Sequence, residues 1–230
     1  MVGVVRRLRA FWPRPEAART HPARYAGDSG WKRVVDVLFG TALLLAVSPL
    51  MAAVAIGVWL DSGSPVLFRQ ERIGRDGKPF TMLKFRSMLP GADDQGHRAA
   101  AEAWFAGNPA PLGYKAWKDR RVTRFGRWIR RTSLDELPQL VNVVRGDMSL
   151  VGPRPAIPYE LSLYESSHFE RQAVRPGITG LWQILGRDRL SAIEMMALDR
   201  RYVQECSAGL DLKILAHTIP SLFGRRPRNL

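Results

Sequence analysis

The apolar run from Val34 to Leu60 constrains this chain more than any other feature, because its only charged side chain is Asp36. A straight helix of that length would extend about 40 Å, more than the ~30 Å hydrocarbon core of a membrane requires. The run begins too far from the N-terminus for a secretory signal, and no small-residue cleavage site follows it. We therefore expect a membrane helix, with a buried core helix as the alternative.

Ser48 and Pro49 lie near the centre of this run. Proline lacks a backbone N–H and clashes with the preceding turn, and it disfavours helical geometry at the residue before it. Two arrangements fit: a kinked spanning helix, or a re-entrant helix–break–helix hairpin that returns to its starting side. Basic residues outnumber acidic ones on both flanks, whereas a true span should show a charge difference. We therefore expect a re-entrant hairpin over 31–61, with a group such as the Ser48 hydroxyl pairing the carbonyl that Pro49 leaves free.

The chain is strongly basic, with 35 Lys and Arg against 21 Asp and Glu and a net charge of +14. Such an excess favours an anionic partner: nucleic acid, a phosphate-bearing substrate or anionic lipid. Hydrophobic residues make up 46% of the chain, which argues against wholesale disorder. Because Cys206 is the only cysteine, an intrachain disulfide and a metal site built on several thiolates are excluded.

The first 30 residues form a basic extension. The stretch VGVVRRLRAFW places apolar residues at helical spacing with three arginines between them, a pattern typical of a helix lying on an anionic membrane surface. A frayed basic tail is the alternative. The following residues are rich in proline, glycine and small side chains, which predicts a linker.

The rest of the chain predicts mostly α-helix with one small β-hairpin. Strand-like runs at 66–68 and 80–85 flank Asp76-Gly77, a turn signal. Helical patterns occupy 92–106, 123–131, 158–170, 190–206 and 210–223. In the helix at 123–131, Phe125, Trp128 and Ile129 share a face among arginines. That helix suits either a membrane interface or nucleic acid.

The stretch TSLDELPQL, residues 132–140, places two carboxylates side by side in this basic chain. Ser133 and Glu136 fit a capping box, which would explain both acids structurally. Pro138 follows too closely for a long regular helix, so it holds the acids at a bend. That geometry also suits a carboxylate nucleophile. Cationic side chains that could neutralise a substrate's charge are Lys84, Arg130 and Arg154.

The sequence resembles a known family, the bacterial polyprenyl-phosphate hexose-1-phosphate transferases, also called monotopic phosphoglycosyl transferases. The matching stretches, in chain order, are KRVVD at 32–36, the apolar run with Ser48-Pro49, LFRQERIGRDGKPFTMLKFRSM at 67–88, RRTSLDELPQLVNVVRGDMSLVGPRP at 130–155, RPGITGLWQILGR at 175–187 and LDLKIL at 210–215. Together they cover nearly everything but the N-terminal extension. The order and length of these blocks make the resemblance specific, and it identifies the short, catalytic-domain form.

The resemblance implies a role for individual residues. Asp135 matches the nucleophile and a metal ligand, and Glu136 matches its partner in a catalytic dyad. The residues expected to bind substrate phosphates are Lys84, Arg86, Arg130, Arg154 and Arg175. The break in the re-entrant helix matches Ser48 and Pro49, and polar anchors where that helix enters the membrane match Lys32, Arg33 and Asp36.

The resemblance also implies a reaction and a location. A UDP-sugar would bind with Mg²⁺, Asp135 would take the sugar phosphate and release UMP, and polyprenyl phosphate would accept it. A cytoplasmic catalytic domain over 62–224, followed by a basic tail at 225–230, would lie on the inner membrane of a bacterium and contact anionic lipids. Two other classes remain: a membrane-tethered nucleic-acid-binding protein, and a non-catalytic scaffold for polysaccharide assembly. No nucleic-acid module is recognisable, so no nucleic-acid partner is expected.

Overall fold

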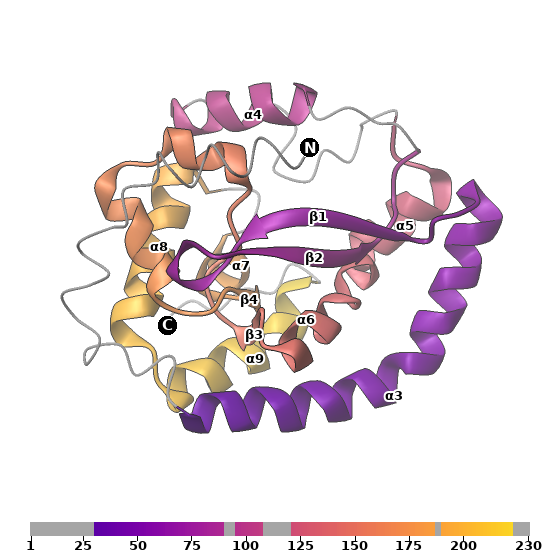
Figure 1. The fold of residues 1–230 in the computed structure, drawn as a ribbon, viewed down its shortest axis with the longest axis horizontal. Helices are drawn as coiled ribbons and strands as arrows, with labels where there is room; N and C mark the ends of the chain where they lie inside the picture. The colour runs from indigo at the N-terminus through magenta and orange to yellow at the C-terminus, as the bar shows by residue number, and fades with distance from the viewer. Residues whose placement is uncertain (1–29, 90–94, 108–120, 187–189, 223–230) are drawn as a thin grey trace.

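The computed structural model describes residues 30–89, 95–107, 121–186 and 190–222 (Figure 1). The amphipathic helix expected near the N-terminus, its linker and the basic tail at 225–230 lie outside these ranges. Within them the chain is mostly helical with two small sheets, as the sequence predicts in outline.

Helix α3, Gly30–Ser62, contains the whole apolar run and has Pro49 inside it. In Figure 1 it lies along the lower edge of the molecule and then turns upward on the right. Proline is the usual cause of such a bend. The Ser48 hydroxyl donates to the carbonyl of Leu45 at 2.8 Å, the group that the missing N–H of Pro49 would otherwise bind. The expected local partner is therefore confirmed, and the break is a bend within one helix rather than an interruption.

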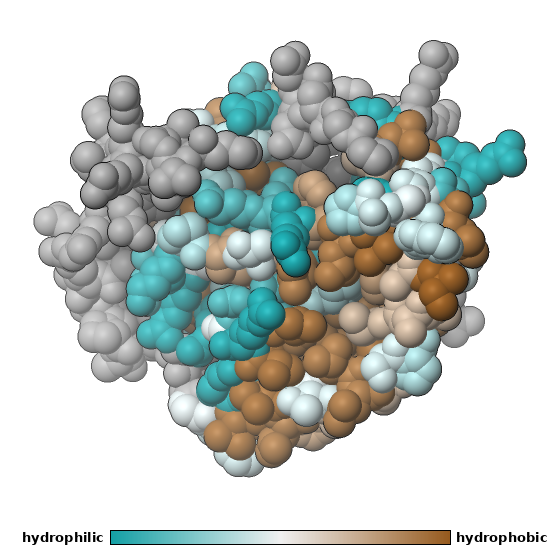
Figure 2. All heavy atoms as spheres, turned by 45° about the vertical axis from the view of Figure 1, so that its right-hand side comes forward, coloured by the Kyte–Doolittle hydropathy of each residue, from teal (hydrophilic) through white to brown (hydrophobic). Residues whose placement is uncertain are grey.

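Most of the apolar surface of α3 is uncovered by the rest of the protein. Only 11% of its most apolar 18-residue window is buried, and the helix is long and apolar enough to cross a membrane. Figure 2 shows hydrophobic side chains gathered over the lower and right-hand parts of this face. The large exposed apolar residues of α3 are Trp31, Val34, Leu38, Phe39, Leu43, Leu45, Leu50, Ile56, Trp59 and Leu60. This exposure is the reverse of what a buried core helix would show.

The predicted hairpin is a long two-stranded ribbon made of β1, Leu67–Ile73, and β2, Pro79–Phe85. Its turn is a short 3₁₀ segment, Arg75–Gly77, in which Asp76 has a φ of 54° and Gly77 a φ of 71°. The Asp-Gly turn is thus confirmed, since both residues tolerate left-handed backbone better than most.

Four predicted helices are present, at α4 Gln95–Phe105, α5 Arg124–Thr132, α8 Ala192–Glu205 and α9 Ala208–Leu222. On α5, Ile129 is buried and Phe125 packs beside it against α3, while Trp128 is exposed with its ring centroid 5.4 Å from that of Phe125. The helix predicted at 158–170 is wrong. Two 3₁₀ segments, η4 Pro158–Leu163 and η5 Ser166–Ala173, replace it, because Tyr164 and Glu165 between them have extended backbone.

A small parallel sheet was not expected from the sequence. It pairs β3, Ser149–Val151, with β4, Gly177–Thr179. Short helices α6, Gln139–Arg145, and α7, Leu181–Leu185, lie near it. The main core gathers side chains from these elements and from β2, α8 and α9, including Met82, Val143, Met148, Leu181, Tyr202 and Ile214.

Helix α6 lies between the ribbon and α3 (Figure 1) and is fixed to the ribbon by Asn142. The Asn142 amide nitrogen donates to the carbonyl of Thr81 at 2.7 Å, and its oxygen accepts from the N–H of Leu83 at 3.0 Å. These bonds pair two backbone groups of β2 that would otherwise be buried without a partner at this side of the strand. They therefore set the position of β2 relative to α6.

The beginning of α3 is bound to the same body of the protein. Arg33 donates to the carbonyls of Val143 and Val144, in the last turn of α6, at 2.6 and 2.7 Å. Gly146 follows with a φ of 97°, and a Cβ there would lie 3.2 Å from the Arg33 guanidinium, so glycine suits the backbone and leaves room for the arginine.

Two further side chains bind the same end of α3. Asp36 is buried and accepts from the Ser149 hydroxyl and the Leu150 N–H at 3.1 and 3.0 Å. Lys32 pairs with Asp211 of α9 at 2.6 Å. The three polar residues at the start of α3 therefore bind the rest of the domain.

Candidate active site

The two adjacent carboxylates lie on a tight turn between α5 and α6. Helix α5 ends at Thr132, and Ser133 follows in the left-handed region with a φ of 57°. A 3₁₀ turn, η3, then spans Leu134–Glu136. The predicted capping box is wrong, because the Ser133 side chain caps nothing there; its N–H instead bonds to the Arg130 carbonyl and closes α5. The acids therefore sit at a sharp reversal of the chain.

Burial distinguishes the two acids. Asp135 is only 5% exposed, whereas Glu136 is partly accessible. The Lys84 ammonium, from β2, lies 3.9 Å from the Glu136 carboxylate. Arg130, in the last turn of α5, is half-buried at the same junction. The structure thus brings Lys84, distant in sequence, to the dyad.

Arg86, two residues further along the chain than Lys84, has a different position. Its Nη2 donates to the carbonyls of Ser62 and Gly63, both at 2.6 Å, and to the Ser62 hydroxyl at 2.9 Å. These groups end α3, where carbonyls lack helical partners and favour a cation. Arg86 therefore holds the C-terminal end of α3, and its predicted contact with substrate phosphate stays a prediction.

The two remaining predicted phosphate ligands also bind protein groups. Arg154 is buried and forms a two-pronged ion pair with Glu160, with N–O distances of 3.1 and 3.2 Å. Arg175 donates through Nε to the carbonyl of Gly146 at 3.0 Å, at the end of α6 away from the dyad. For these two arginines as well, contact with substrate stays a prediction.

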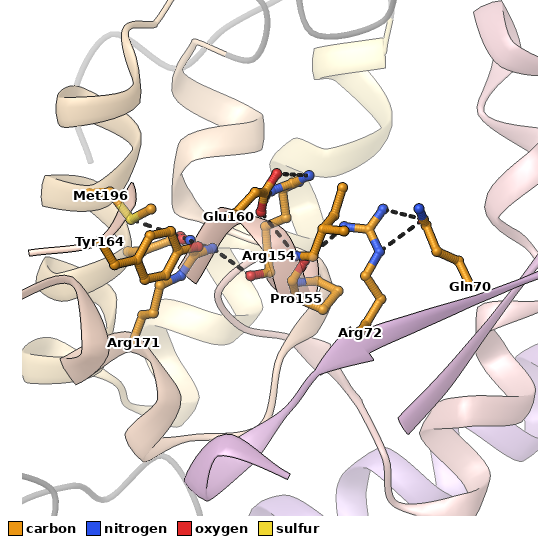
Figure 3. Close-up of polar contacts among 10 residues, drawn as sticks. Gln70, Arg72, Arg154, Pro155, Glu160, Tyr164, Arg171 and Met196 are labelled. Carbon is orange, nitrogen blue, oxygen red and sulfur yellow. Dashed lines mark hydrogen bonds and ion pairs between the residues drawn. The ribbon is translucent and has the colours of Figure 1, made fainter. Parts of the chain in front are cut away.

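Arg154 belongs to a buried network of charged side chains (Figure 3). Arg72, from β1, donates to the carbonyl of Pro155 at 3.0 Å and through two nitrogens to Gln70. Arg171 bonds to the backbone carbonyl of Arg154 and to the Tyr164 hydroxyl, and it pairs with Asp199 at 2.6 Å. Two of the three buried guanidinium groups are thus paired with buried carboxylates, and the third, that of Arg72, is bonded to a carbonyl and an amide.

The charges in this network shift one another's pKa values. Burial alone would raise the pKa of Glu160, but Arg154 and Arg72 outweigh it and hold the pKa below its ordinary value of 4.5. Burial raises the pKa of Asp199 to about 6, although Arg171 and Arg154 oppose the rise. Glu160 is therefore the more firmly ionised of the two carboxylates and offsets most of the positive charge of the arginines.

The network adjoins the dyad. Burial lowers the pKa of Arg72, while nearby negative groups raise it, Glu160 most strongly and Glu136 among the others. The negative charge of Glu136 is thus one of the influences that raise the pKa of Arg72. Neither Arg72 nor Glu160 was singled out from the sequence. Arg72 had one signal, its place in the block at 67–88 that resembles the family, although it lies beyond the strand expected at 66–68; Glu160 had none.

The donor set at the dyad suits one kind of metal. Across the described ranges, no group of three or more His, Cys, Asp or Glu side chains gathers as a metal cage. Magnesium does not need one, because it commonly binds one or two carboxylates together with substrate phosphates and water. Asp135 and Glu136 fit that pattern, with Asp135 as the predicted ligand.

Comparisons with known proteins agree on one family. A model described as bacterial sugar transferase matches residues 27–225. The exopolysaccharide production protein ExoY of Sinorhizobium fredii is 43% identical over 198 residues, which cover 83% of this chain and 84% of that protein. The UDP-glucose:undecaprenyl-phosphate glucose-1-phosphate transferase of Escherichia coli is 39% identical over 196 residues, or 82% of this chain and 39% of that protein. The undecaprenyl-phosphate glucose phosphotransferase of Komagataeibacter xylinus is 43% identical over 208 residues, or 84% and 36%.

The buried network yields a prediction about stability. Glu160→Gln leaves Arg154 and Arg72 buried opposite a neutral amide, so we expect a loss of roughly 3–5 kcal/mol at pH 7, read as a lower melting temperature in detergent. Because the folded pKa of Glu160 is depressed, its contribution is present above about pH 4.5 and fades as pH falls further. The difference between wild type and variant should therefore shrink at low pH.

The matched control for this substitution is Glu205→Gln. Glu205 is exposed and pairs with Arg201 one helical turn away, so its loss should change the melting temperature little. A Glu160→Gln protein as stable as the wild type at pH 7 would show that the network does not depend on this carboxylate.

Proposed function

This chain belongs to the bacterial sugar transferase family, and from that membership we propose that it transfers a sugar-1-phosphate from a UDP-sugar to undecaprenyl phosphate and releases UMP. Relatives named for exopolysaccharide production and for glucose-1-phosphate transfer support the reaction. The observation in this chain that carries the proposal is the Asp135–Glu136 pair on its tight turn, with the Lys84 ammonium 3.9 Å from Glu136.

In the first step, an oxygen of the Asp135 carboxylate attacks the phosphorus atom that bears the sugar. The bond from that phosphorus to the bridging oxygen breaks, and UMP leaves with the electron pair. Asp135 then carries the sugar phosphate as an acyl phosphate. Lys84 and Arg130 are placed to offset the negative charge that gathers on the phosphoryl oxygens. The burial of Asp135 keeps water away from the acyl phosphate.

In the second step, an oxygen of undecaprenyl phosphate attacks the same phosphorus. The bond to Asp135 breaks, the carboxylate is regenerated, and the product is a lipid-linked sugar pyrophosphate. Glu136 is positioned to hold the Lys84 ammonium beside the reacting group throughout. When Mg²⁺ is bound, held by Asp135 with Glu136 beside it, it screens the donor's pyrophosphate charge from the nucleophile.

We also propose that α3 is re-entrant and that the domain lies on the cytoplasmic face of the bacterial inner membrane, where anionic lipid attracts its positive charge. Both ends of α3 bind the same compact body: Arg33 binds α6 at one end, and Arg86 binds Ser62 and Gly63 at the other. A spanning helix would place its ends on opposite sides, about 30 Å of hydrocarbon apart. UDP-sugars are cytoplasmic, which sets the side.

The covalent step is tested by Asp135→Asn. An amide cannot act as the nucleophile, so we expect turnover to fall by at least three orders of magnitude, roughly the loss seen when a nucleophile is removed. Wild-type protein incubated with a UDP-sugar and Mg²⁺, without lipid acceptor, should gain the mass of one phosphosugar. The variant should gain none.

Asp147→Asn is a control carboxylate substitution, because Asp147 accepts a bond from Asn142 at the other end of α6; it should keep the adduct. Near-normal activity of Asp135→Asn would rule out the nucleophile assigned here.

The topology is tested with single cysteines at Ala10 and Asp61 in a Cys206→Ser background. In intact cells, a membrane-impermeant maleimide should label neither position, and both should react once the membrane is permeabilised. Labelling of position 10 alone in intact cells would mean that α3 spans the membrane. Pro49→Ala combined with Ser48→Ala should straighten the helix and shift position 10 toward external labelling.

A further inference from the structure

Gln70 lies on the same face of the β1–β2 ribbon as Lys84, and neither the motifs nor the proposed reaction gives it a role. In the ribbon register, Phe68 pairs with Lys84 and Gln70 pairs with Met82. Residues paired in this way project from the same face, and Gln70 is the diagonal neighbour of Lys84, within reach of a long side chain. Arg72, two residues further on, shares that face.

Arg72 fixes which way the Gln70 amide points. Its Nε and Nη2 both donate to Gln70 Oε1, at 3.0 and 2.7 Å (Figure 3). A guanidinium has donors and no acceptor, so the amide oxygen must face Arg72 and the NH₂ group must face away. Arg72 is itself buried and held by the Pro155 carbonyl. The orientation of the Gln70 amide is therefore set before any ligand arrives.

Lys84 and Arg72, the two neighbours of Gln70 on this face, both interact electrostatically with Glu136. Lys84 lies 3.9 Å from Glu136, and the charge of Glu136 acts on Arg72. Gln70 lies between these two residues on the same face of the ribbon. Among the described residues no hydrogen bond from its NH₂ group is formed, and the side chain is partly accessible. A neutral donor whose orientation is fixed thus lies between Arg72 and Lys84 on this face of the ribbon.

We propose that Gln70 is a donor-binding residue of this site: its Nε2 donates a hydrogen bond to an oxygen of the bound nucleotide sugar, and Arg72 is the positioning residue that aims it. The inference rests on the proposed function, because it takes a UDP-sugar as the ligand. A neutral donor binds a phosphoryl or hydroxyl oxygen without adding charge to the cations beside it. It also discriminates against a donor lacking that oxygen, because its N–H would then be desolvated without a partner.

Gln70→Glu keeps the oxygen that accepts from Arg72 and changes only the NH₂ end of the side chain. The carboxylate still accepts from Arg72, now with opposite charge, so the melting temperature should not fall. Its other oxygen replaces the N–H and repels an anionic donor. We expect the dissociation constant for the UDP-sugar, measured by calorimetry in the inactive Asp135→Asn background, to rise on the order of tenfold or more. Binding of undecaprenyl phosphate should be unchanged.

Gln70→Met removes the donor without adding charge and should weaken UDP-sugar binding in the same direction by a smaller factor. Glu71→Gln is the control, because Glu71 is exposed on the opposite face of the same strand, and it should leave binding unchanged. Arg72→Lys keeps the positive charge but loses the two-pronged bond to Gln70. It should therefore weaken UDP-sugar binding when Gln70 is present, and should weaken it little further when combined with Gln70→Met.

Two results separate this inference from the proposed function. If both Gln70 variants bind the UDP-sugar as tightly as the parent protein, the role of Gln70 is overturned while the reaction stands. If the wild-type chain neither binds a UDP-sugar nor releases UMP, the proposed function fails first. Should Gln70→Glu fail to fold, the binding constant of Gln70→Met decides the question.

Discussion

The bond of Arg33 to the last carbonyls of α6 is the contact on which much of the site's geometry depends. Arg33 belongs to the membrane helix, and α6 directly follows the dyad in the chain. From α6, Asn142 reaches β2 and fixes the strand that carries Lys84. At the far end of the same strand, Arg86 binds the end of α3. The membrane helix and the dyad are therefore parts of one closed frame.

This frame explains how a reaction between a water-soluble donor and a lipid can use one small domain. Both ends of α3 are bonded to elements that also position Asp135 and Lys84, so in the proposed arrangement the depth of α3 in the membrane would set the depth of the carboxylate pair. The apolar face of α3 stays uncovered by the protein and is available to lipid. In the proposed reaction, the lipid phosphate then approaches from the side on which the helix lies.

Several charged side chains are buried near the carboxylate pair, where burial is unfavourable unless opposite charges or hydrogen bonds offset it. Arg154 pairs with Glu160, Arg171 pairs with Asp199, and Arg72 is bonded to the carbonyl of Pro155. Such a network is weak evidence for stability, but removing one member is costly. Arg72 of this network is bonded to the amide of Gln70, and the charge of Glu136 is among those that raise its pKa. The network therefore fixes the positions of the Arg72 and Gln70 side chains.

The sequence predicted the parts that depend on local pattern. The long apolar helix, the hairpin with its Asp-Gly turn and four helices followed from periodicity and turn chemistry. The dyad was recognised from its motif, and the charge of Lys84 was placed near it. The capping box at Ser133 failed because tertiary packing turned the backbone left-handed there, which no local propensity reveals. The β3–β4 pair and the Arg154–Glu160 ion pair were not predicted, because each joins residues whose contacts only the assembled fold defines.

Transfer of the whole sugar phosphate, rather than of the sugar alone, is the central claim, and a labelled donor tests it most directly. The purified chain in lipid nanodiscs would be given undecaprenyl phosphate, Mg²⁺ and a panel of UDP-sugars carrying a radioactive β-phosphate. The reaction proposed for Asp135 predicts that at least one donor yields UMP and that the label moves into the lipid. Release of UDP, with the label left in the nucleotide, or no nucleotide release from any donor, would contradict it.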